Sequence, residues 1–469
     1  MPSKQGLDTD DPLAFITAPP VDETPEQRET RLLLEKEAKD ISDSIDEQLS
    51  KERQQEKKGP KPVKILLLGQ SESGKSTTLK NFQLMYDPKA FLAERSSWKA
   101  VIQLNVVRSV HVVLDIITRA ENLQRDSPLV DDDLIALKLR LSPLVQVEEV
   151  LMQRLAPCGP DQSDPARLAQ VSYAQKPRGV KSEVAVNSAA QWKAIFTRAF
   201  DAEDSSSGAV AQDDGETDPS VVLSTHAADL KLLWENITVQ QLLVQENIRL
   251  QEAAGFFLDC LDEVTALNYA PTDDHILRAR LKTLGVSEHR IRMTSGGMSG
   301  SISRDWRIYD VGGHRSLRPA WAPYFDDMHS IIFLCPISAF DQVLAEEPRV
   351  NRLADSVNLW TMIVSNKLLA KTNIILFLNK TDIMRSKLDS GIRFSDYVNS
   401  YGKRPNDFES ASSYLRKKFG GLFKEKSTLP RVFYCHLTTV TDRKSTQLIL
   451  ANVKDQLMQV YLSDASLLM

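Results

Sequence analysis

The feature that most constrains this chain is a short apolar run that ends in a glycine-rich loop. Residues 63–69, VKILLLG, have the length and composition of a buried parallel strand, and the loop GQSESGKS over residues 69–76 follows at once. The loop fits the pattern G-x-x-x-x-G-K-[ST], and a helical pattern comes after it. In that setting, backbone N–H groups and the helix N-terminus surround phosphate oxygens. The sequence therefore predicts a phosphate site in which Lys75 reaches the outer phosphates and the Ser76 hydroxyl binds Mg²⁺.

Four further apolar segments predict the rest of one sheet. They are residues 306–312, 330–337, 373–380 and 431–437, and helical patterns such as 350–370 and 446–462 separate or follow them. Alternating strands and helices are typical of a doubly wound, mostly parallel sheet, so we expect an α/β fold.

A long segment of different character separates the first strand from the others. Residues 97–120 and 230–268 show helical spacing of apolar residues. The middle, about 121–220, is uneven and contains stretches rich in Ser, Asp, Gly and Pro, such as 156–168 and 203–220. That composition cannot bury enough apolar surface to order itself, so we expect long loops or a flexible insertion there.

The N-terminal part is predicted to be a disordered segment, residues 1–25, followed by one long charged helix over residues 26–58. Apolar residues form a narrow stripe on this helix, and the pairs Glu35–Lys39 and Glu47–Lys51 have a favourable spacing. The stripe fits two interpretations equally well, a solvated helix or a helix that docks a partner. Its members are Leu34, Ala38, Ile41 and Ile45.

Composition excludes several classes of protein. The net charge of −5 over 469 residues gives no reason to expect a nucleic acid partner. The polar, acidic N-terminus is not a signal peptide, no apolar run approaches a membrane span, and Pro2 stands where myristoylation needs glycine. We expect a cytoplasmic protein with weak, peripheral membrane association. The four cysteines show no metal or disulfide spacing; they are Cys158, Cys260, Cys335 and Cys435.

Residues 379–382, NKTD, predict the base that the phosphate loop's ligand carries. A carboxylate such as Asp382 accepts both the ring N1–H and the exocyclic amine of guanine, whereas adenine offers neither in that place. Lys380 can lie along the base plane, and Asn379 ends the predicted strand. The tetrapeptide alone is compatible with a surface turn, but its order after the phosphate loop favours guanine recognition.

Residues 310–315, DVGGHR, have the features of a sensor for a terminal phosphate. Asp310 ends a predicted strand, as a second carboxylate near the metal should, and Gly313 can offer its N–H to the phosphate. A loop of this kind is ordered with the phosphate and loose without it.

With these motifs in place, the chain resembles the alpha subunit of heterotrimeric G proteins from residue 26 to the C-terminus. The family's GAGESGKST corresponds to GQSESGKST here, LRTRVKTTG to LRARLKTLG at 277–285, and DVGGQR to DVGGHR. The family's NKKD corresponds to NKTD, and its TCAT loop to TTVT at 438–441.

The resemblance implies a Ras-like P-loop GTPase domain, residues 61–90 and 275–469, with an all-helical domain, residues 91–274, inserted after its first helix. It implies a preceding N-terminal helix over residues 26–60. It also implies binding of GDP or GTP with Mg²⁺, a beta-gamma dimer bound through the N-terminal helix and switch II, a seven-transmembrane receptor at the C-terminus, and an effector. Membrane attachment would then lie at the inner face of the plasma membrane, through partners.

By motif position, the resemblance makes Arg280 the built-in arginine finger, with Arg278 as a nearby competitor for the role. Thr283 takes the switch I place that binds Mg²⁺, and Glu72 is positioned to pair with Arg280. With Lys75, Arg280 and His314 as the catalytic set, the remaining nucleotide-binding positions are Glu72, Ser73, Gly74, Ser76, Thr77, Leu277, Arg278, Thr283, Asp310, Gly313, Asn379, Lys380, Asp382 and Val440.

Two departures from the family bear on hydrolysis. His314 stands where the family has a glutamine that orients the attacking water, and an imidazole is shorter and more rigid than that amide. Ser71 replaces a glycine where the backbone passes the terminal phosphate, although a serine that turns away costs little. We therefore expect slow hydrolysis in preference to a role of His314 as a general base.

Other departures concern partner surfaces and the base. Pro319 is expected to interrupt the helix of switch II, and residues 294–305 are expected to form a long loop between two strands near the switches. Val440 replaces an alanine beside the guanine ring, where its extra methyls can speed GDP release.

The sequence therefore leaves three candidate functions. The first is a guanine nucleotide switch that hydrolyses GTP slowly, and the second is a nucleotide-bound scaffold that scarcely turns over. The third, a metabolic P-loop kinase or ATPase, conflicts with the NKTD motif, Thr283 and Asp310.

Overall fold

The computed structural model describes residues 24–58, 62–123, 131–155, 185–187, 218–246, 248–284, 286–297 and 300–466. The expected disorder of the first residues and most of the expected insertion at 121–220 lie outside these ranges. The chain forms two compact units, residues 1–61 and 62–469, which are described separately.

The first unit contains the predicted charged helix, α2, which runs from Pro25 to Lys58. Glu47 and Lys51 form the expected ion pair at 2.7 Å, while Glu35 bonds to Arg31 one turn earlier. The apolar stripe is exposed on this unit, with Ile41 at 60% of its full accessibility.

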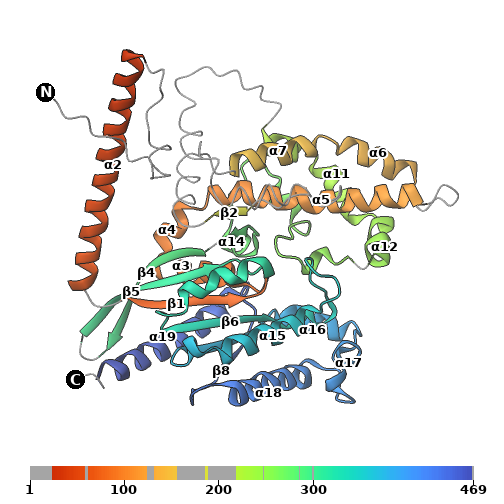
Figure 1. Cartoon of the computed structure of the whole chain (residues 1–469). Helices are drawn as coiled ribbons and strands as arrows, with labels where there is room; N and C mark the ends of the chain where they lie inside the picture. The colour runs from red at the N-terminus through yellow and green to blue at the C-terminus, as the bar shows by residue number, and fades with distance from the viewer. Residues whose placement is uncertain are drawn as a thin grey trace, which may run out of the picture. The chain divides into compact units, whose positions relative to one another are not determined.

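The second unit is built on a six-stranded sheet (Figure 1). The strand order is β4-β5-β1-β6-β7-β8, and only β4 runs antiparallel to its neighbour. The expected mostly parallel α/β sheet is therefore confirmed. The strands are β1 (Val63–Gly69), β4 (Val286–Gly297), β5 (Gly300–Val311), β6 (Ser330–Pro336), β7 (Asn373–Asn379) and β8 (Tyr434–Thr438).

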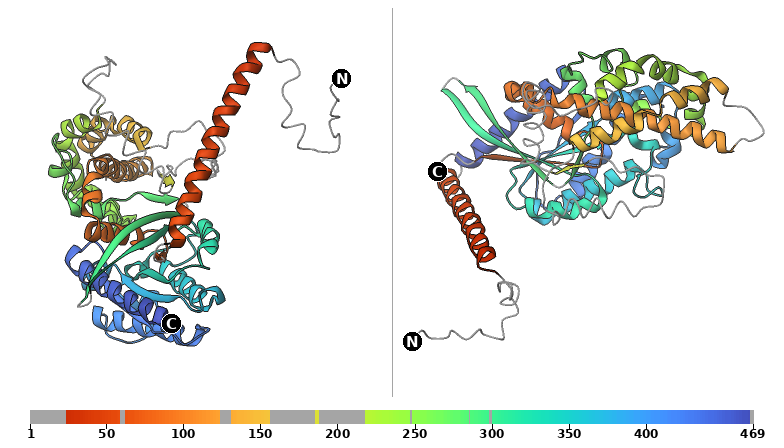
Figure 2. Two further views of the ribbon diagram at one scale, coloured as in Figure 1. Left: turned by 90° about the vertical axis from the view of Figure 1, so that its left-hand side faces the viewer. Right: turned by 90° about the horizontal axis from the view of Figure 1, so that it is seen from above.

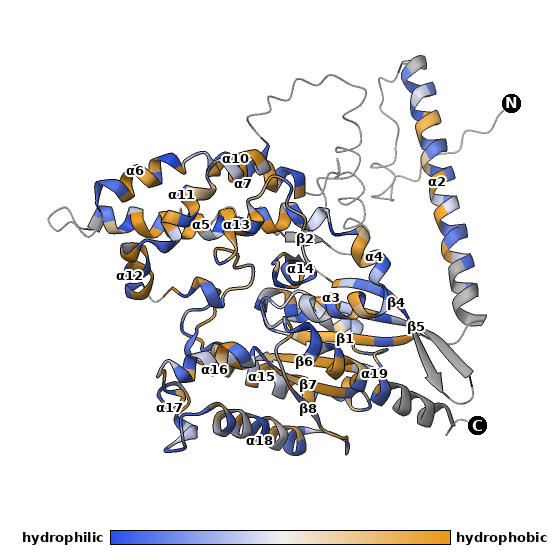
Figure 3. Cartoon of the chain, turned by 180° about the vertical axis from the view of Figure 1, so that it is seen from behind, coloured by the Kyte–Doolittle hydropathy of each residue, from blue (hydrophilic) through white to orange (hydrophobic). Residues whose placement is uncertain are grey.

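Helices cover both faces of the sheet because alternate strand residues point to opposite sides. Ile65 and Leu67 of β1 pack with α3 (Lys75–Tyr86) and α19 (Arg443–Ser466). The opposite face packs against α15 (Arg352–Ser365), α16 (Thr381–Asp389) and α18 (Phe408–Lys426). In Figure 3, strands β1, β6 and β7 accordingly appear strongly hydrophobic.

A second core lies among helices only, around the long helix α5 (Ser97–Leu123) (Figure 1, Figure 2). By length and apolar composition this helix could cross a bilayer, contrary to the expectation that no apolar run approaches a membrane span, but 67% of the apolar window is buried in the protein, as in a core helix. Its neighbours are α6 (Asp132–Arg140), α7 (Leu144–Leu155), α10 (Pro219–Thr225), α11 (Ala227–Glu235) and α12 (Ile237–Gln245).

The remaining elements in the described part of the chain are short. They are α4 (Pro88–Ala93), η2 (Leu250–Glu252), α13 (Leu261–Val264), α14 (Asp273–Arg278), η3 (Arg315–Tyr324), η4 (Ile337–Asp341), η5 (Lys367–Leu369), α17 (Phe394–Tyr397), η6 (Asn399–Tyr401) and the paired strands β2 (Ala185–Asn187) and β3 (Lys282–Leu284).

Three expectations about local structure were wrong. Residues 132–155 are not loops but helices α6 and α7, because Leu134, Leu137 and Leu151 recur at helical spacing and are buried. Residues 230–268 are not continuously helical, since breaks follow α11 and α12. Residues 294–305 mostly extend β4 and β5, whose backbones pair from Thr294 with Ser303 to Gly297 with Gly300.

Pro319 was expected to interrupt a helix, and its segment is indeed a 3-10 helix, η3, which also contains Pro323. Each proline removes a backbone N–H, so a regular α-helical ladder cannot form there.

We predict that Leu151→Ala lowers the free energy of unfolding by about 2–5 kcal/mol, because its side chain is fully buried among the helices. Leu139→Ala is the matched control, since Leu139 lies on the neighbouring helix α6 and is 67% exposed. Thermal unfolding followed by circular dichroism measures both. Equal transition temperatures for the two variants would show that α6 and α7 do not belong to the core.

Candidate functional site

The phosphate loop has a backbone that only particular residues allow. Gly74 has φ 101°, and a Cβ added there would approach Asn379 Nδ2 to 2.4 Å. Gly69 has φ 148° and would meet the carbonyl oxygen of Leu334 at 2.4 Å. Glu72 also adopts a left-handed φ of 59°, a conformation that costs energy for a residue with a side chain.

Lys75 is the buried cation of this loop. Its Nζ donates to the carbonyl oxygens of Gly69 at 3.0 Å and Gln70 at 2.7 Å. Burial lowers the pKa of Lys75 to about 8, against the raising effect of Asp310. A partly desolvated ammonium at a helix N-terminus is a natural site for phosphate oxygens, so the residues present fit the expected ligand.

The residues expected near Mg²⁺ supply hard oxygen donors. Ser76 Oγ donates to Asp310 Oδ2 at 2.6 Å, and Asp310 is 2% exposed at the end of β5. Mg²⁺ prefers one or two such protein oxygens together with phosphate and water, and this pair fits that donor set. Thr283 lies in β3, and its side chain is outside the described part of the chain.

The two neighbouring arginines, Arg278 and Arg280, have different partners in the structure. Arg280 forms an ion pair with Glu72 of the phosphate loop. Arg278 instead bonds to both carboxylate oxygens of Asp259, at 2.7 and 2.8 Å, and to the carbonyl oxygen of Phe256. Of the two, only Arg280 contacts the phosphate loop directly.

Glu72 lies among several cations. Burial alone would raise the pKa of Glu72, but the charges of Arg280, Arg352 and Lys380 outweigh it and lower the pKa to about 2. Arg352 was not predicted from the sequence, yet its Nη2 also donates to the carbonyl oxygen of Ser71 at 2.8 Å.

Two further residues that sequence reasoning missed hold the backbone around Arg280. Asn105 of α5 accepts from the Arg280 N–H at 2.8 Å and donates to its carbonyl oxygen at 2.9 Å. Lys80 Nζ donates to the carbonyl oxygens of Ile276 at 2.8 Å and Ala279 at 2.9 Å, and burial lowers its pKa to about 7. Asn105 and Lys80 are polar residues within otherwise apolar helical patterns, and this feature of the sequence could have indicated them.

The predicted base motif is joined to the phosphate loop through Asn379. This fully buried amide donates to the carbonyl oxygen of Ser73 at 2.7 Å and accepts from Thr438 Oγ1 at 3.0 Å and from the Val440 N–H at 3.2 Å. Asp382 accepts from Thr439 Oγ1 at 3.3 Å. The two loops that the sequence assigned to guanine are thus in contact.

The other predicted binding residues lie at the same edge of the sheet. Lys380 follows β7 with a left-handed φ of 62°, and burial lowers its pKa. Thr77 Oγ1 donates to the carbonyl oxygen of Leu277 at 3.4 Å, which joins α3 to α14. A Cβ added to Gly74 would lie 2.9 Å from Val440 Cγ2, so a methyl group of Val440 faces the phosphate loop.

Gly313 and His314 lie where β5 leads into η3. A Cβ on Gly313 would lie 2.3 Å from the carbonyl carbon of Gln70, so a side chain is excluded at this close approach. The ring of His314 contacts Ser316 Oγ through Nδ1 at 2.8 Å and Glu346 Oε1 through Nε2 at 3.4 Å.

An ion network joins the helical core to the sheet beside this site. Lys387 Nζ lies 2.6 Å from carboxylates of both Glu252 and Asp341. Arg249 Nη1 completes the network at 2.5 Å from Asp341. Lys387 and Asp341 are both 3% exposed, so these charges are mutually compensated where water is scarce.

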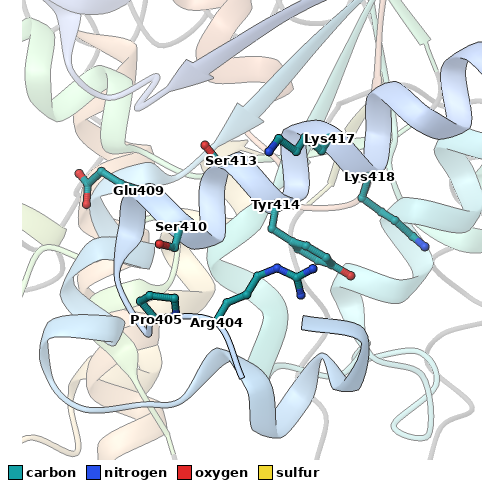
Figure 4. Close-up of a pocket in the computed structure, with 8 residues that line it drawn as sticks. All are labelled: Arg404, Pro405, Glu409, Ser410, Ser413, Tyr414, Lys417 and Lys418. Carbon is teal, nitrogen blue, oxygen red and sulfur yellow. The ribbon is translucent and has the colours of Figure 1, made fainter. Parts of the chain in front are cut away.

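A groove of about 680 Å³ lies elsewhere, between the loop before α18 and that helix (Figure 4). It contains none of the predicted nucleotide residues. Its lining is Arg404, Pro405, Glu409, Ser410, Ser413, Tyr414, Lys417 and Lys418.

Comparison with known proteins agrees with this geometry. A sequence model of the family described as "G-protein alpha subunit" matches residues 39–457. The chain is 31% identical to the guanine nucleotide-binding protein alpha-4 subunit of Mycosarcoma maydis, over 97% of this chain and 95% of that protein. It is 29% identical to the alpha-1 subunit of the same organism, over 93% and 98%. It is 28% identical to the G(o) subunit alpha of Geodia cydonium, over 96% and 99%.

We predict that nucleotide binding takes up a proton at Lys75. In the free protein this group loses its proton as pH rises through about 8, and a bound phosphate favours the charged form. Affinity for GDP should therefore be constant well below pH 8 and fall between pH 8 and 9, by up to about tenfold per unit. Calorimetry at pH 8.5 in two buffers of different ionisation enthalpy measures the uptake. Lys75→Met should abolish it, and zero uptake by the wild type would contradict the assignment.

We also predict that Asn105→Ala slows GTP hydrolysis by about tenfold, because the Arg280 backbone loses two hydrogen bonds of about 1 kcal/mol each. Single-turnover hydrolysis is the measurement, and Asn122→Ala, an exposed asparagine further along the described chain, is the control. Adding Asn105→Ala to Arg280→Ala should cause little further loss. A full additional tenfold loss would show that Asn105 does not act through Arg280.

Proposed function

Because this chain belongs to the G-protein alpha subunit family, we propose that it is a guanine nucleotide-dependent signalling switch whose intrinsic GTP hydrolysis is slow. Members of this family bind guanine nucleotides and are generally GTPases that work with beta-gamma dimers, receptors and effectors. The slow rate and the particular roles of residues are the finer parts of the proposal.

The observation that carries the proposal is the Asn379 side chain. It bonds to the phosphate loop at Ser73 and to the 438–441 loop, and it precedes Lys380 and Asp382. One buried amide thus connects the residues suited to guanine with those suited to phosphates. A surface turn with the same letters would have no such connection.

The proposed roles follow from charge and position. Lys75 neutralises the outer phosphates, and Ser76 with Asp310 provides the oxygens near Mg²⁺, which when bound offsets phosphate charge. Arg280 stabilises charge on the transferring phosphoryl group once it leaves Glu72. Asp382 discriminates guanine by accepting its two N–H donors.

Two residues support the slow rate of hydrolysis. Ser71 stands where the family has glycine, and His314 stands where the family has glutamine. The glutamine usual in the family can accept from and donate to a water, whereas the His314 ring already contacts Ser316 and Glu346. Turning it toward a water would cost both contacts, and phosphoryl transfer depends mainly on positioning. The same contacts favour the second candidate, a nucleotide-bound scaffold that scarcely turns over.

The remaining assignments are proposals about partners and boundaries. We assign the GTPase domain to residues 61–90 and 275–469 and the helical domain to residues 91–274. The exposed stripe of α2 and the η3 segment are the proposed beta-gamma surfaces, and the C-terminus is the proposed receptor contact. Location in the cytoplasm with peripheral, partner-dependent membrane association completes the proposal.

Loading the purified protein with GTP and measuring hydrolysis and GDP release separately tests the function. We expect binding of GDP and GTP but not ATP in calorimetry with Mg²⁺, slow single-turnover hydrolysis, and a rate at least about tenfold higher in His314→Gln. Arg280→Ala should lower the rate further.

Undetectable turnover with tight binding would support the scaffold, a normal family rate would refute the slow switch, and ATP preference would refute both.

A further inference from the structure

Gln70 is a polar phosphate-loop side chain that the predicted site does not use. The family's loop has alanine at this position, and here the glutamine is 1% exposed. Its Nε2 donates to the carbonyl oxygen of Arg352 at 2.8 Å and to the carboxylate of Asp355. Both acceptors belong to α15, so the side chain ties the phosphate loop to that helix.

The same carboxylate also holds the η3 segment. Arg318 of η3 donates to Asp355 through Nη1 at 3.1 Å and through Nη2 at 2.6 Å. Burial would raise the pKa of Asp355, but Arg318 and Gln70 outweigh it and keep the carboxylate ionised. Asp355 Oδ2 therefore accepts from both Gln70 and Arg318, and Oδ1 accepts from Arg318 alone of the two.

The orientation of the Gln70 amide is fixed by its surroundings. Both Nε2 hydrogens have acceptors, whereas Oε1 is buried without a hydrogen-bond partner among the described residues. Exchanging the two ends of the amide would set Oε1 against a carbonyl oxygen and a carboxylate, which is repulsive. The position thus requires a donor.

Backbone contact reinforces this connection. Gly313, just before η3, approaches the Gln70 backbone so closely that a Cβ would lie 2.3 Å from the carbonyl carbon of Gln70. The segment from Gly313 to Arg318 is therefore restrained by Gln70 at its start, through backbone packing, and at Arg318, through Asp355.

We propose that Gln70 is a positioning residue that keeps the η3 segment ordered whichever guanine nucleotide is bound. The links from Gln70 to Asp355 and from Asp355 to Arg318 are made by protein groups alone, and Gln70 adds to them a hydrogen bond from the phosphate loop. A loop that should loosen with GDP is thereby held in part by the phosphate loop itself. The inference rests on the proposed switch function and deepens it, because it concerns how far the switch segment changes between its two states.

Hydrogen–deuterium exchange over residues 313–325 tests the proposal. In the wild type we expect similar, slow exchange with GDP and with GTPγS. In Gln70→Ala, a hydrogen bond to a charged group is lost, so exchange with GDP should become about tenfold faster, with a smaller change for GTPγS. Exchange over residues 379–388, which Gln70 does not contact, serves as the internal control.

Two more variants separate hydrogen bonding from packing. Gln70→Met keeps the length but has no donor, and it should behave as Gln70→Ala does. Gln70→Glu points an acceptor at Asp355 and should exchange fastest. In an Arg318→Ala background, Gln70→Ala should add little.

Wild-type exchange in Gln70→Met, or equal exchange over residues 313–325 in all variants, would overturn the proposal. Failure of the proposed function looks different. In that case the wild type binds no guanine nucleotide, and the comparison of wild type with Gln70→Met, made without ligand, still decides whether Gln70 restrains η3.

Discussion

The buried amide of Asn379 is the interaction on which the site depends. Parallel strands bring their carboxyl ends to one edge of a sheet, and there β7 delivers this residue beside the phosphate loop and the 438–441 loop. Its three hydrogen bonds use one donor and one acceptor oxygen, so neither loop can shift without leaving a buried polar group unpaired. The loops proposed for base recognition and for phosphate binding are therefore held together, although the two motifs are about three hundred residues apart in the chain.

The sequence predicted those parts of the site whose functional residues lie next to one another in the chain. The motifs at residues 69–76 and 379–382 are recognisable from their residue types and spacing. Each follows a short apolar run that predicts a strand. Asn105 and Asp355 were missed because their partners are distant, 175 residues for Arg280 and 285 for Gln70. Helices α6 and α7 were missed because the 121–220 stretch as a whole has the composition of loops. Within it, the leucines of these two helices recur at three- and four-residue spacing.

Charge placement explains why two neighbouring arginines have different roles. Arg278 and Arg280 differ by two positions, yet one turns to Asp259, an exposed residue in the turn before α13, and the other to Glu72 in the phosphate loop. The backbone between them is gripped by Lys80 and Asn105, so the chain direction at this point is set by α3 and α5. Helices α3 and α5 thereby determine which guanidinium faces the phosphate loop.

The long β4–β5 hairpin leaves β4 at the border of the sheet, with one row of backbone N–H and C=O groups not covered by a neighbouring strand in the described part of the chain. Such an edge can pair with an edge strand of another molecule and so lead to aggregation. Arg290 and Arg292 of β4 form ion pairs with Glu288 and Asp305 of the same hairpin, and the side chain of Arg292 is 76% exposed. Charged side chains along an exposed edge strand disfavour pairing with a second copy, so these ion pairs oppose the addition of a strand from another molecule.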